Sequence, residues 1–440
     1  MKTNTARGWS SAIGALIATM FGTTVVSSLS IFIMPIVQAT GVKVTQITLI
    51  FTLSALGSMI CAFFTGPVVK ALPRKLIYLL GAASNLAVML SVAFCMDNLI
   101  VLYICAVFHG FGSIYAGTTM YQIVVSEWFD KGRGTLFSLT SIFISGCSAV
   151  MIPVNATLVA NLGYQNAALI IGIYVFILMA VPGVFLVSAG SPGKYGMNPI
   201  DFKEKAKDIE KEKAKQAAPV VSLSIMQVMK TPVIWLILLV AFLGSFASRA
   251  YATLASPYYQ SMGLDSIQAA FMISIVNITG FVSSLLFGII SDKVNTKIAA
   301  LVFGTIASIG FLLAYVWHGL VMAIIAAVCF GCTQCIANLF PPTHATQVYG
   351  RGPATPGMLG YLRVAMTAGS IISPMIAGIM LDATGEFGGL LTIMGVLVVI
   401  AVILSQIATG KKMTEKLDAF KAKAAEAAES EKLQAQNAQA

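Results

Sequence analysis

Residues 288–297 read GIISDKVNTK and decide the fold, because GPVVKALPRK at residues 66–75 occupies the same place in the first half of the chain. Both segments follow an apolar run, begin with Gly and end with Lys, and they lie half a chain length apart. A second pair, KGRG at residues 131–134 and YGRG at residues 349–352, repeats at nearly the same spacing. The chain therefore consists of two copies of one unit, each about half its length.

The composition places both copies in a membrane. Of the 440 residues, 58% are hydrophobic and only 10% are charged, whereas soluble domains carry about 25% charged residues. So little charge cannot cover a surface in water, which excludes a soluble enzyme of ordinary composition. A run of about 20 apolar residues crosses a bilayer as a helix. The sequence holds twelve such runs, at residues 11–37, 45–66, 76–96, 99–124, 135–160, 165–188, 232–258, 265–290, 298–317, 319–346, 355–381 and 389–409.

Residues 190–230 interrupt this pattern with a charged stretch that we interpret as a solvated cytoplasmic linker. We expect residues 1–189 to form an N-terminal six-helix bundle, residues 231–410 a C-terminal six-helix bundle, and residues 411–440 a cytoplasmic tail. The predicted fold class is thus an all-α integral membrane protein with twelve transmembrane helices in two bundles related by pseudo-two-fold symmetry. Such repeats are typical of secondary transporters, whose substrate site lies near mid-membrane between the halves.

Basic residues predict the orientation. Among the 27 Lys and Arg, only Lys43 falls in a link on the outer side, and Arg249 and Arg363 lie inside apolar runs. An excess of Lys and Arg marks cytoplasmic links, so we expect both termini in the cytoplasm and the protein in the cytoplasmic membrane. The net charge of +10 is then an orientation signal and not a sign of nucleic-acid binding.

Several segments carry a resemblance to a known family. The link at 288–297 resembles the Gly-x-x-x-Asp-Arg/Lys signature of the major facilitator superfamily, and this resemblance covers nearly the whole chain. EWFDKGRG at 127–134 and SIMQVMKTPVIW at 224–235 are similar to the monocarboxylate and oxalate:formate exchanger branch. The first copy of the signature has Lys70 where Asp is usual and Pro73 where Gly is usual. The resemblance implies that charged residues near the links act as gates between the bundles, and the candidates are Arg74, Arg133, Asp292 and Lys293.

Two arginines inside the apolar runs are the main candidates for contact with a substrate. Arg363 lies about eight residues into its run and shares one helical face with Thr367, whereas Arg249 lies in the outer half of its run. Of the 17 Asp and Glu, only Asp265 falls in a run, as its first residue at the outer end, so the sequence offers these cations no acidic partner at membrane depth. Charge at that depth usually faces a cavity, and a guanidinium matches a carboxylate in bidentate fashion. We therefore predict that Arg249 and Arg363 bind an organic anion. The alternative is that they snorkel or bond to carbonyl groups, and the depth of Arg249 also permits a role in an outer gate.

Four further polar residues lie at mid-depth in runs that line the central path in the resembled fold. His109 could titrate during transport, because its unperturbed pKa is about 6.5, or it could be a neutral histidine bonded across a helix pair. Gln334 and Asn338, one turn apart, could bond a substrate or bridge helices. Oxalate-type exchangers have a basic residue in the eighth span, and this chain has Asn277 as the most polar mid-depth group there.

The sequence lacks the motifs that mark ATP-driven transporters and common classes of enzyme. It contains no Walker-type phosphate loop, no Gly-x-Ser-x-Gly elbow and no His-Glu-x-x-His pair, so we predict a protein that is not an enzyme and needs no cofactor or metal. The Cys329-x-x-Cys332-x-x-Cys335 run spreads too widely on one helix to chelate a metal and is interpreted as helix packing.

These observations predict a monomeric secondary transporter that moves a small organic anion, a mono- or dicarboxylate, by exchange or symport. An empty cationic site is unfavourable in a low dielectric, which favours exchange. The alternative function is efflux of hydrophobic or drug-like compounds by the same fold. A membrane sensor or scaffold would require a signalling domain, and the linker and tail are too short and biased in composition to form one.

Overall fold

The computed structural model describes residues 5–115, 117–131, 133–188, 190, 192–195, 200–201, 225–313, 319–349 and 355–422. The elements in chain order are α1 (Thr5–Thr40), α2 (Val44–Ala71), α3 (Arg74–Phe94), α4 (Leu99–Tyr115), α5 (Thr118–Trp128), β1 (Phe129–Lys131), α6 (Arg133–Phe185), the 3-10 turn η1 (Pro192–Tyr195), β2 (Ile200–Asp201), α8 (Ile225–Met229), α9 (Pro232–Ser261), α10 (Ser266–Lys293), α11 (Thr296–Leu313), α12 (Leu320–Gly331), the π-helix η2 (Cys335–Leu339), α13 (Phe340–Tyr349), α14 (Thr355–Thr384) and α15 (Phe387–Ala408).

Eleven helical segments of the described chain are long and apolar enough to cross a membrane. One of them, Ile142–Phe185 in α6, has 44 residues, which corresponds to about 66 Å of helix, whereas a bilayer core measures about 30 Å. Gly163 divides it, because its φ of 76° is not helical. The segment is therefore two antiparallel spans joined at Gly163, and the described chain contains the twelve spans that the sequence predicts.

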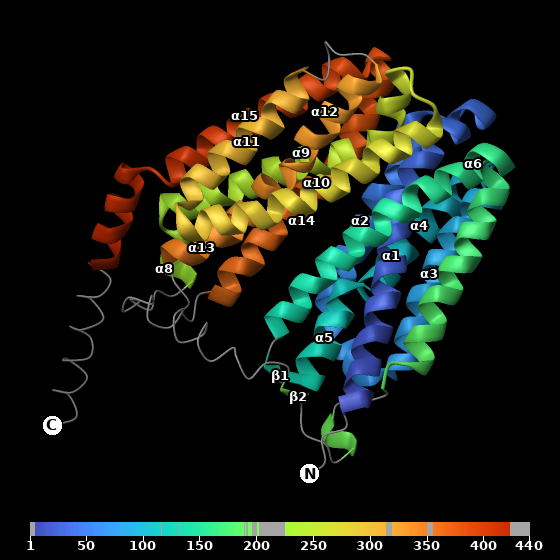
Figure 1. The fold of residues 1–440 in the computed structure, drawn as a ribbon, viewed down its shortest axis with the longest axis horizontal. Helices are drawn as coiled ribbons and strands as arrows, with labels where there is room; N and C mark the ends of the chain where they lie inside the picture. Colours follow the sequence, from blue (N-terminus) through green and yellow to red (C-terminus); the bar gives the residue numbers. More distant parts are fainter. Residues whose placement is uncertain are drawn as a thin grey trace.

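The spans form two bundles, which we call the N-bundle (α1–α6) and the C-bundle (α9–α15). Figure 1 shows the N-bundle in blue to green and the C-bundle in yellow to red. The start of α1, the end of α15, β1, β2 and α8 lie at one end of the molecule, which we call the terminal face, and the other end is the distal face. The ribbons of the two bundles meet near the distal face and diverge toward the terminal face (Figure 1).

Hydrogen bonds between the bundles agree with this shape. Thr52 Oγ1 of α2 donates to the carbonyl oxygen of Ile371 in α14 at 2.9 Å. Ser274 Oγ of α10 donates to the carbonyl oxygen of Ala149 in α6 at 2.7 Å. A third contact joins the start of α2 to Asp382 at the distal face. Among the described residues, all the hydrogen bonds between bundles lie between mid-depth and the distal face.

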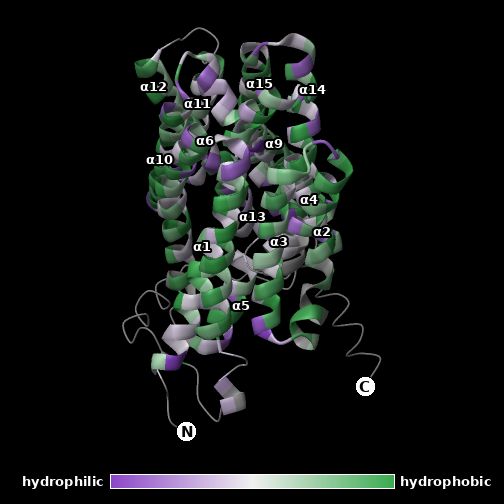
Figure 2. Ribbon diagram, turned by 90° about the vertical axis from the view of Figure 1, so that its right-hand side faces the viewer, coloured by the Kyte–Doolittle hydropathy of each residue, from purple (hydrophilic) through white to green (hydrophobic). Residues whose placement is uncertain are grey.

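The outer surface of the bundles is apolar, as a lipid-facing surface must be. Large hydrophobic side chains stay exposed along the spans, for example Phe94 at 69% and Phe185 at 77% of their free surface. Figure 2 shows hydrophobic residues along the helices through the middle of the molecule. Bilayer lipid covers such a surface, because water would not solvate it.

A short strand pair departs from the all-helical pattern at the terminal face. β1 and β2 run parallel, with Phe129 opposite Ile200. Gly8 of α1 packs under this pair, since a Cβ there would meet the Ile200 side chain at 2.3 Å. The beginning of the linker is therefore attached to the N-bundle.

Candidate functional site

The two intramembrane arginines lie at different depths of the C-bundle. α9 and α14 run side by side. A Cβ on Gly369 of α14 would lie 2.5 Å from a backbone atom of Phe242 and 3.1 Å from one of Phe246, both in α9. Gly369 therefore lies level with this part of α9. Arg249 lies about five residues from this level toward the distal face, and Arg363 six residues toward the terminal face. At 1.5 Å per residue their Cα atoms are about 16 Å apart along the bundle. Both side chains lean toward their own helix N-terminus, which preserves the separation.

Arg249 is the charge at mid-depth. Its span is Pro232–Ser261, so its Cα lies about 4 Å from the middle of the helix. The side chain is partly exposed, and within the described part of the chain its guanidinium has no hydrogen bond, ion pair or ring contact. No carboxylate among the described residues neutralises it there. The guanidinium is therefore free to bind an anion from outside the protein.

His109 of α4 belongs to the N-bundle, and its charge interacts with that of Arg249 in the C-bundle. It is 1% exposed. Its Nδ1 shares a hydrogen bond of 2.7 Å with Ser54 Oγ of α2, whereas its Nε2 is buried without a partner in the described structure. A buried polar atom without a partner costs free energy, so Nε2 is a polar group with unused capacity for a hydrogen bond.

Close packing fixes the position of His109. A Cβ on Gly110 would lie 2.1 Å from the Ser54 carbonyl oxygen, and one on Gly57 would lie 2.3 Å from that of Val107. α2 and α4 therefore approach each other at backbone distance. Ser58 Oγ adds a bond of 3.0 Å to the Gly110 carbonyl oxygen. The imidazole is attached to a rigid crossing of two helices.

Three amides complete the polar groups at mid-depth. Asn277 is partly exposed and donates to the carbonyl oxygen of Ile273 in its own helix at 3.0 Å. Gln334 and Asn338 are exposed and bond to each other. Gln334 directly precedes the π-helix η2 and Asn338 lies within it, and π-helical turns are frequent at functional sites. Gln334 packs beside Gly280, one turn from Asn277, so these three amides form one polar patch between α10 and η2.

Arg363 lies nearer the terminal face. It is eight residues from the middle of its span Met358–Thr384, or about 12 Å. At about 100° per residue it points about 160–180° away from the exposed apolar Tyr361, Ile372 and Ile379, which mark the lipid side. Its side chain is exposed and without a partner among described residues, and the Thr367 hydroxyl donates to its carbonyl oxygen at 2.8 Å. Arg363 therefore faces the space where the bundles diverge.

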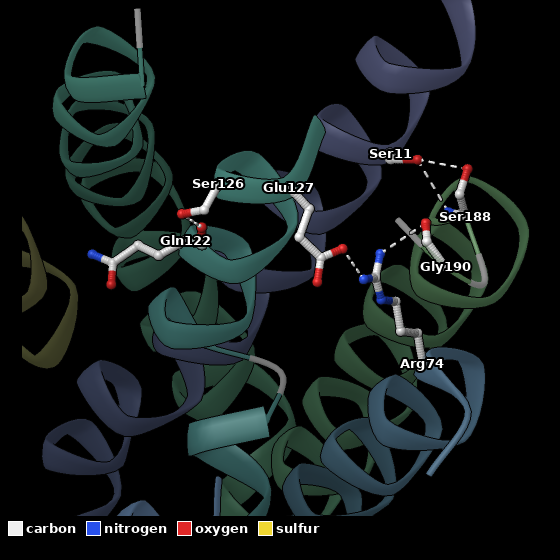
Figure 3. Close-up of polar contacts among 7 residues, drawn as sticks. All are labelled: Ser11, Arg74, Gln122, Ser126, Glu127, Ser188 and Gly190. Atoms are coloured by element: carbon white, nitrogen blue, oxygen red, sulfur yellow. Dashed lines mark hydrogen bonds and ion pairs between the residues drawn. The ribbon is translucent and has the colours of Figure 1, made fainter. Parts of the chain in front are cut away.

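The predicted gate residues lie at the terminal face, and two of them can be described. Figure 3 shows Arg74 bonded to Glu127 of α5 and, at 3.2 Å, to the Gly190 carbonyl oxygen. Beside it, Ser11 Oγ donates to Ser188 Oγ at 2.9 Å. All these partners belong to the N-bundle or the start of the linker, so the contacts of Arg74 in this conformation do not join the bundles. Lys293 is exposed at the end of α10. The side chains of Arg133 and Asp292 lie outside the described residues.

Two residues of this structure were not among the predicted gates. Glu127 pairs with Arg74, although the sequence showed it only as part of a motif. Asp382 crosses between the bundles, and its position after an apolar run predicted only a link. The sequence signal that points to Asp382 is indirect: Lys43 stands where the second copy of the repeat has Asp265.

Comparison with known proteins agrees with the fold. The chain is similar to the crystal structure of a bacterial homolog to the human lysosomal transporter Spinster, in an inward-facing and unoccupied conformation, with a TM-score of 0.72 and 14% identity over 94% of this chain and 99% of that chain. No curated protein sequence matches. A family model described as Major Facilitator Superfamily matches residues 12–355. Since this match spans more than half of the sequence, the chain belongs to the major facilitator superfamily and has the fold of a multi-pass membrane transporter.

Proposed function

We propose that this transporter moves a small organic anion, a mono- or dicarboxylate, by alternating access between the two bundles. The observation that carries the proposal is the mid-depth guanidinium of Arg249, which has no partner among the described residues. A charge at bilayer depth costs roughly 2.5–3.5 kcal/mol on insertion scales and usually has a functional reason. A carboxylate would neutralise it and form two parallel hydrogen bonds with its planar fork.

The surrounding groups supply the rest of the site. His109 Nε2 provides a second polar contact from the N-bundle, so a bound anion would connect the two bundles. Asn277, Gln334 and Asn338 offer amide donors and acceptors for hydroxyl or oxo groups of the substrate. A site with one charge and several neutral polar groups favours a small polar carboxylate over a lipophilic compound.

The separation of the arginines gives them different roles. A gap of about 16 Å along the bundle is too long for a small dicarboxylate to bridge. We assign Arg249 to the central site and Arg363 to the entrance, where a positive group attracts anions toward the path. In this assignment the two arginines contact the anion at successive points of its path.

The predicted topology and transport mode belong to the same proposal. The distribution of basic residues supports a cytoplasmic terminal face, so this conformation would open to the cytoplasm. Exchange is favoured because an empty carrier keeps an uncompensated buried charge while it changes face.

The test is uptake of labelled mono- and dicarboxylates into proteoliposomes, with and without unlabelled anion preloaded inside. Exchange predicts that preloading speeds uptake at least several-fold, whereas symport predicts uptake driven by an imposed ion gradient without preloading. A parallel thermal-shift screen identifies ligands, because binding stabilises the folded state by mass action. Stabilisation by lipophilic cations alone, with no carboxylate transported, would overturn the proposal in favour of efflux.

A further inference from the structure

The helices α2 and α10 are equivalent elements of the internal repeat, and both begin in the same way. Each has 28 residues. Gly41 before α2 has a φ of 70° and Gly263 before α10 has a φ of 90°, and these glycines have the same spacing as the two glycine-headed links that end α2 and α10. Gln46 and Gln268, again at that spacing, each accept a bond from the backbone N–H that begins the helix, at 3.1 and 3.2 Å.

The two helix starts differ in one residue. At α10 the capping residue is Asp265, whose Oδ1 accepts from the backbone N–H groups of Ile267 and Gln268 at 2.9 and 2.8 Å. The equivalent residue of α2 is Lys43, which cannot accept a hydrogen bond through its ammonium. The first copy therefore lacks the acid that caps the helix in the second copy.

Asp382 of the other bundle supplies the missing carboxylate. It lies at the end of α14, far from Val44 in the sequence. Its Oδ1 accepts from the Val44 N–H at 3.1 Å, and its Oδ2 accepts from the Thr45 N–H at 3.0 Å and from the Thr45 hydroxyl. A carboxylate at a helix N-terminus satisfies free N–H groups and interacts favourably with the helix dipole. α2 is thus capped by a residue of the other bundle, whereas α10 is capped by the residue that precedes it in the chain.

This cap lies where the bundles are packed most closely. A Cβ on Gly378, one turn before Asp382, would lie 2.8 Å from the Thr45 Cα. Further along α2, Thr52 bonds to Ile371 of α14. The distal ends of α2 and α14 therefore cannot separate while Asp382 remains bonded to α2.

We propose that Asp382 is a detachable cap that holds the distal face closed and must leave α2 each time the transporter opens on that side. The proposal goes beyond the proposed function, because it concerns the change of conformation and holds whichever substrate is carried. In the state open at the distal face, the first N–H groups of α2 would lose their carboxylate to water.

The test is hydrogen–deuterium exchange of the full-length protein in lipid nanodiscs, followed by mass spectrometry. Asp382→Asn removes the charge and one of the two accepting oxygens while keeping the size of the side chain. We expect about tenfold faster exchange at residues 44–48, as loss of a helix cap implies. We also expect faster exchange at 145–153 and 270–278, which surround the Ala149–Ser274 contact. Asp382 does not touch that contact, so a change there reports separation of the bundles.

Asp265→Asn is the matched control, because it removes the same chemistry at the same face but within one bundle. It should speed exchange at residues 266–269 without the change at 145–153. The variant Lys43→Asp distinguishes the stability of the first turn of α2 from closure of the distal face. It places the acid directly before α2, as Asp265 stands before α10, so residues 44–48 should stay protected from exchange. The new negative charge should repel Asp382, and exchange at 145–153 should then rise.

Two results would overturn the proposal. If Asp382→Asn speeds exchange only at residues 44–48, the carboxylate is a local cap and does not hold the bundles together. If Lys43→Asp leaves residues 145–153 and 270–278 as protected as in the unmodified protein, closure of the distal face does not depend on Asp382. Neither result bears on which anion is transported, so the proposed function is tested separately by uptake.

Discussion

Arg249 has a different environment from Arg74, and this difference supports the binding role that we propose for Arg249. Arg74 is buried and bonded to Glu127 and a carbonyl group, so its charge is satisfied within the N-bundle. Arg249 is partly exposed at mid-depth and unpaired within the described structure. A charged side chain that stabilises the fold is bonded to other groups of the protein, whereas one that binds a ligand leaves its hydrogen-bond donors available.

We expect Arg249→Gln to reduce anion uptake by at least about 30-fold, because losing one partner of a buried charged pair costs roughly 2–5 kcal/mol. The melting temperature should not fall, since the guanidinium holds no other residue of the described chain in place. Uptake into proteoliposomes and thermal unfolding measure the two effects. Lys75→Gln, an exposed cation at the terminal face, is the control. Uptake that survives Arg249→Gln would remove this residue from the site.

Arg363→Gln should give a different kinetic result. If Arg363 attracts anions at the entrance, its loss raises KM several-fold and weakens the dependence of uptake on salt, with kcat nearly unchanged. Initial rates of uptake at low and high ionic strength measure this difference. A fall in kcat as large as that of Arg249→Gln would place both arginines in one site.

His109→Gln should weaken anion binding by about tenfold, since a hydrogen bond to a charged group contributes roughly 1.5–3 kcal/mol. Gln keeps an acceptor for Ser54, so α2 and α4 should remain in contact. The ligand-induced rise in melting temperature measures binding directly. An unchanged rise would assign His109 to helix packing alone.

The sequence could select these residues as candidates but fixed their depth only roughly. Counting charges inside apolar runs was sufficient to select Arg249 and Arg363. Their relative heights depend on how α9 and α14 are shifted along each other, and this shift comes from the contact of Gly369 with Phe242. A run of apolar residues has soft boundaries, so counting from its start could not show how far apart the two arginines lie along the bundle.

At the scale of elements, Gly163 shows how a single backbone conformation produces two spans. Its φ of 76° turns the chain between antiparallel helices of α6. Gly163→Ala should lower stability by roughly 1 kcal/mol, because residues with a Cβ disfavour this conformation. A Cβ there would meet no atom within 4 Å, so the variant introduces no steric clash and tests backbone strain alone.

Gly146→Ala is the matched control for this prediction. Gly146 lies in the same element, and a Cβ there would also meet nothing within 4 Å, but its backbone is helical. We expect this change to be neutral or to raise stability by up to about 1 kcal/mol. Thermal unfolding in detergent compares the two variants. Equal effects would show that Gly163 carries no conformational requirement.

Some elements were predictable and others were not. The twelve spans followed from length and hydropathy, because lipid forces apolar runs to form helices. The π-helix η2 was not visible, since the residues of Cys335–Leu339 are as apolar as their neighbours. The β1–β2 pair was also missed, because it depends on contact between residues 129 and 200, which no local pattern reveals.

At the scale of the whole molecule, the regular spacing between the two copies of the link predicted two equivalent bundles, and the structure confirms this architecture. That spacing could not predict which face is open. The two conformations of a transporter share the same helices and differ only in the contacts between bundles. In the described structure the hydrogen bonds between the bundles are few, and they include those of Thr52 with Ile371 and of Ser274 with Ala149.

The attachment of the linker to the N-bundle has a mechanical consequence. The chain leaves β2 at Asp201 and enters α8 at Ile225. A segment of this length can extend to about 80 Å. That length exceeds the width of a single bundle, so chain length between Asp201 and Ile225 does not by itself hold the two bundles together. Contacts between side chains of the two bundles must then close the terminal face, and removing a few residues between Asp201 and Ile225 should leave transport rates unchanged.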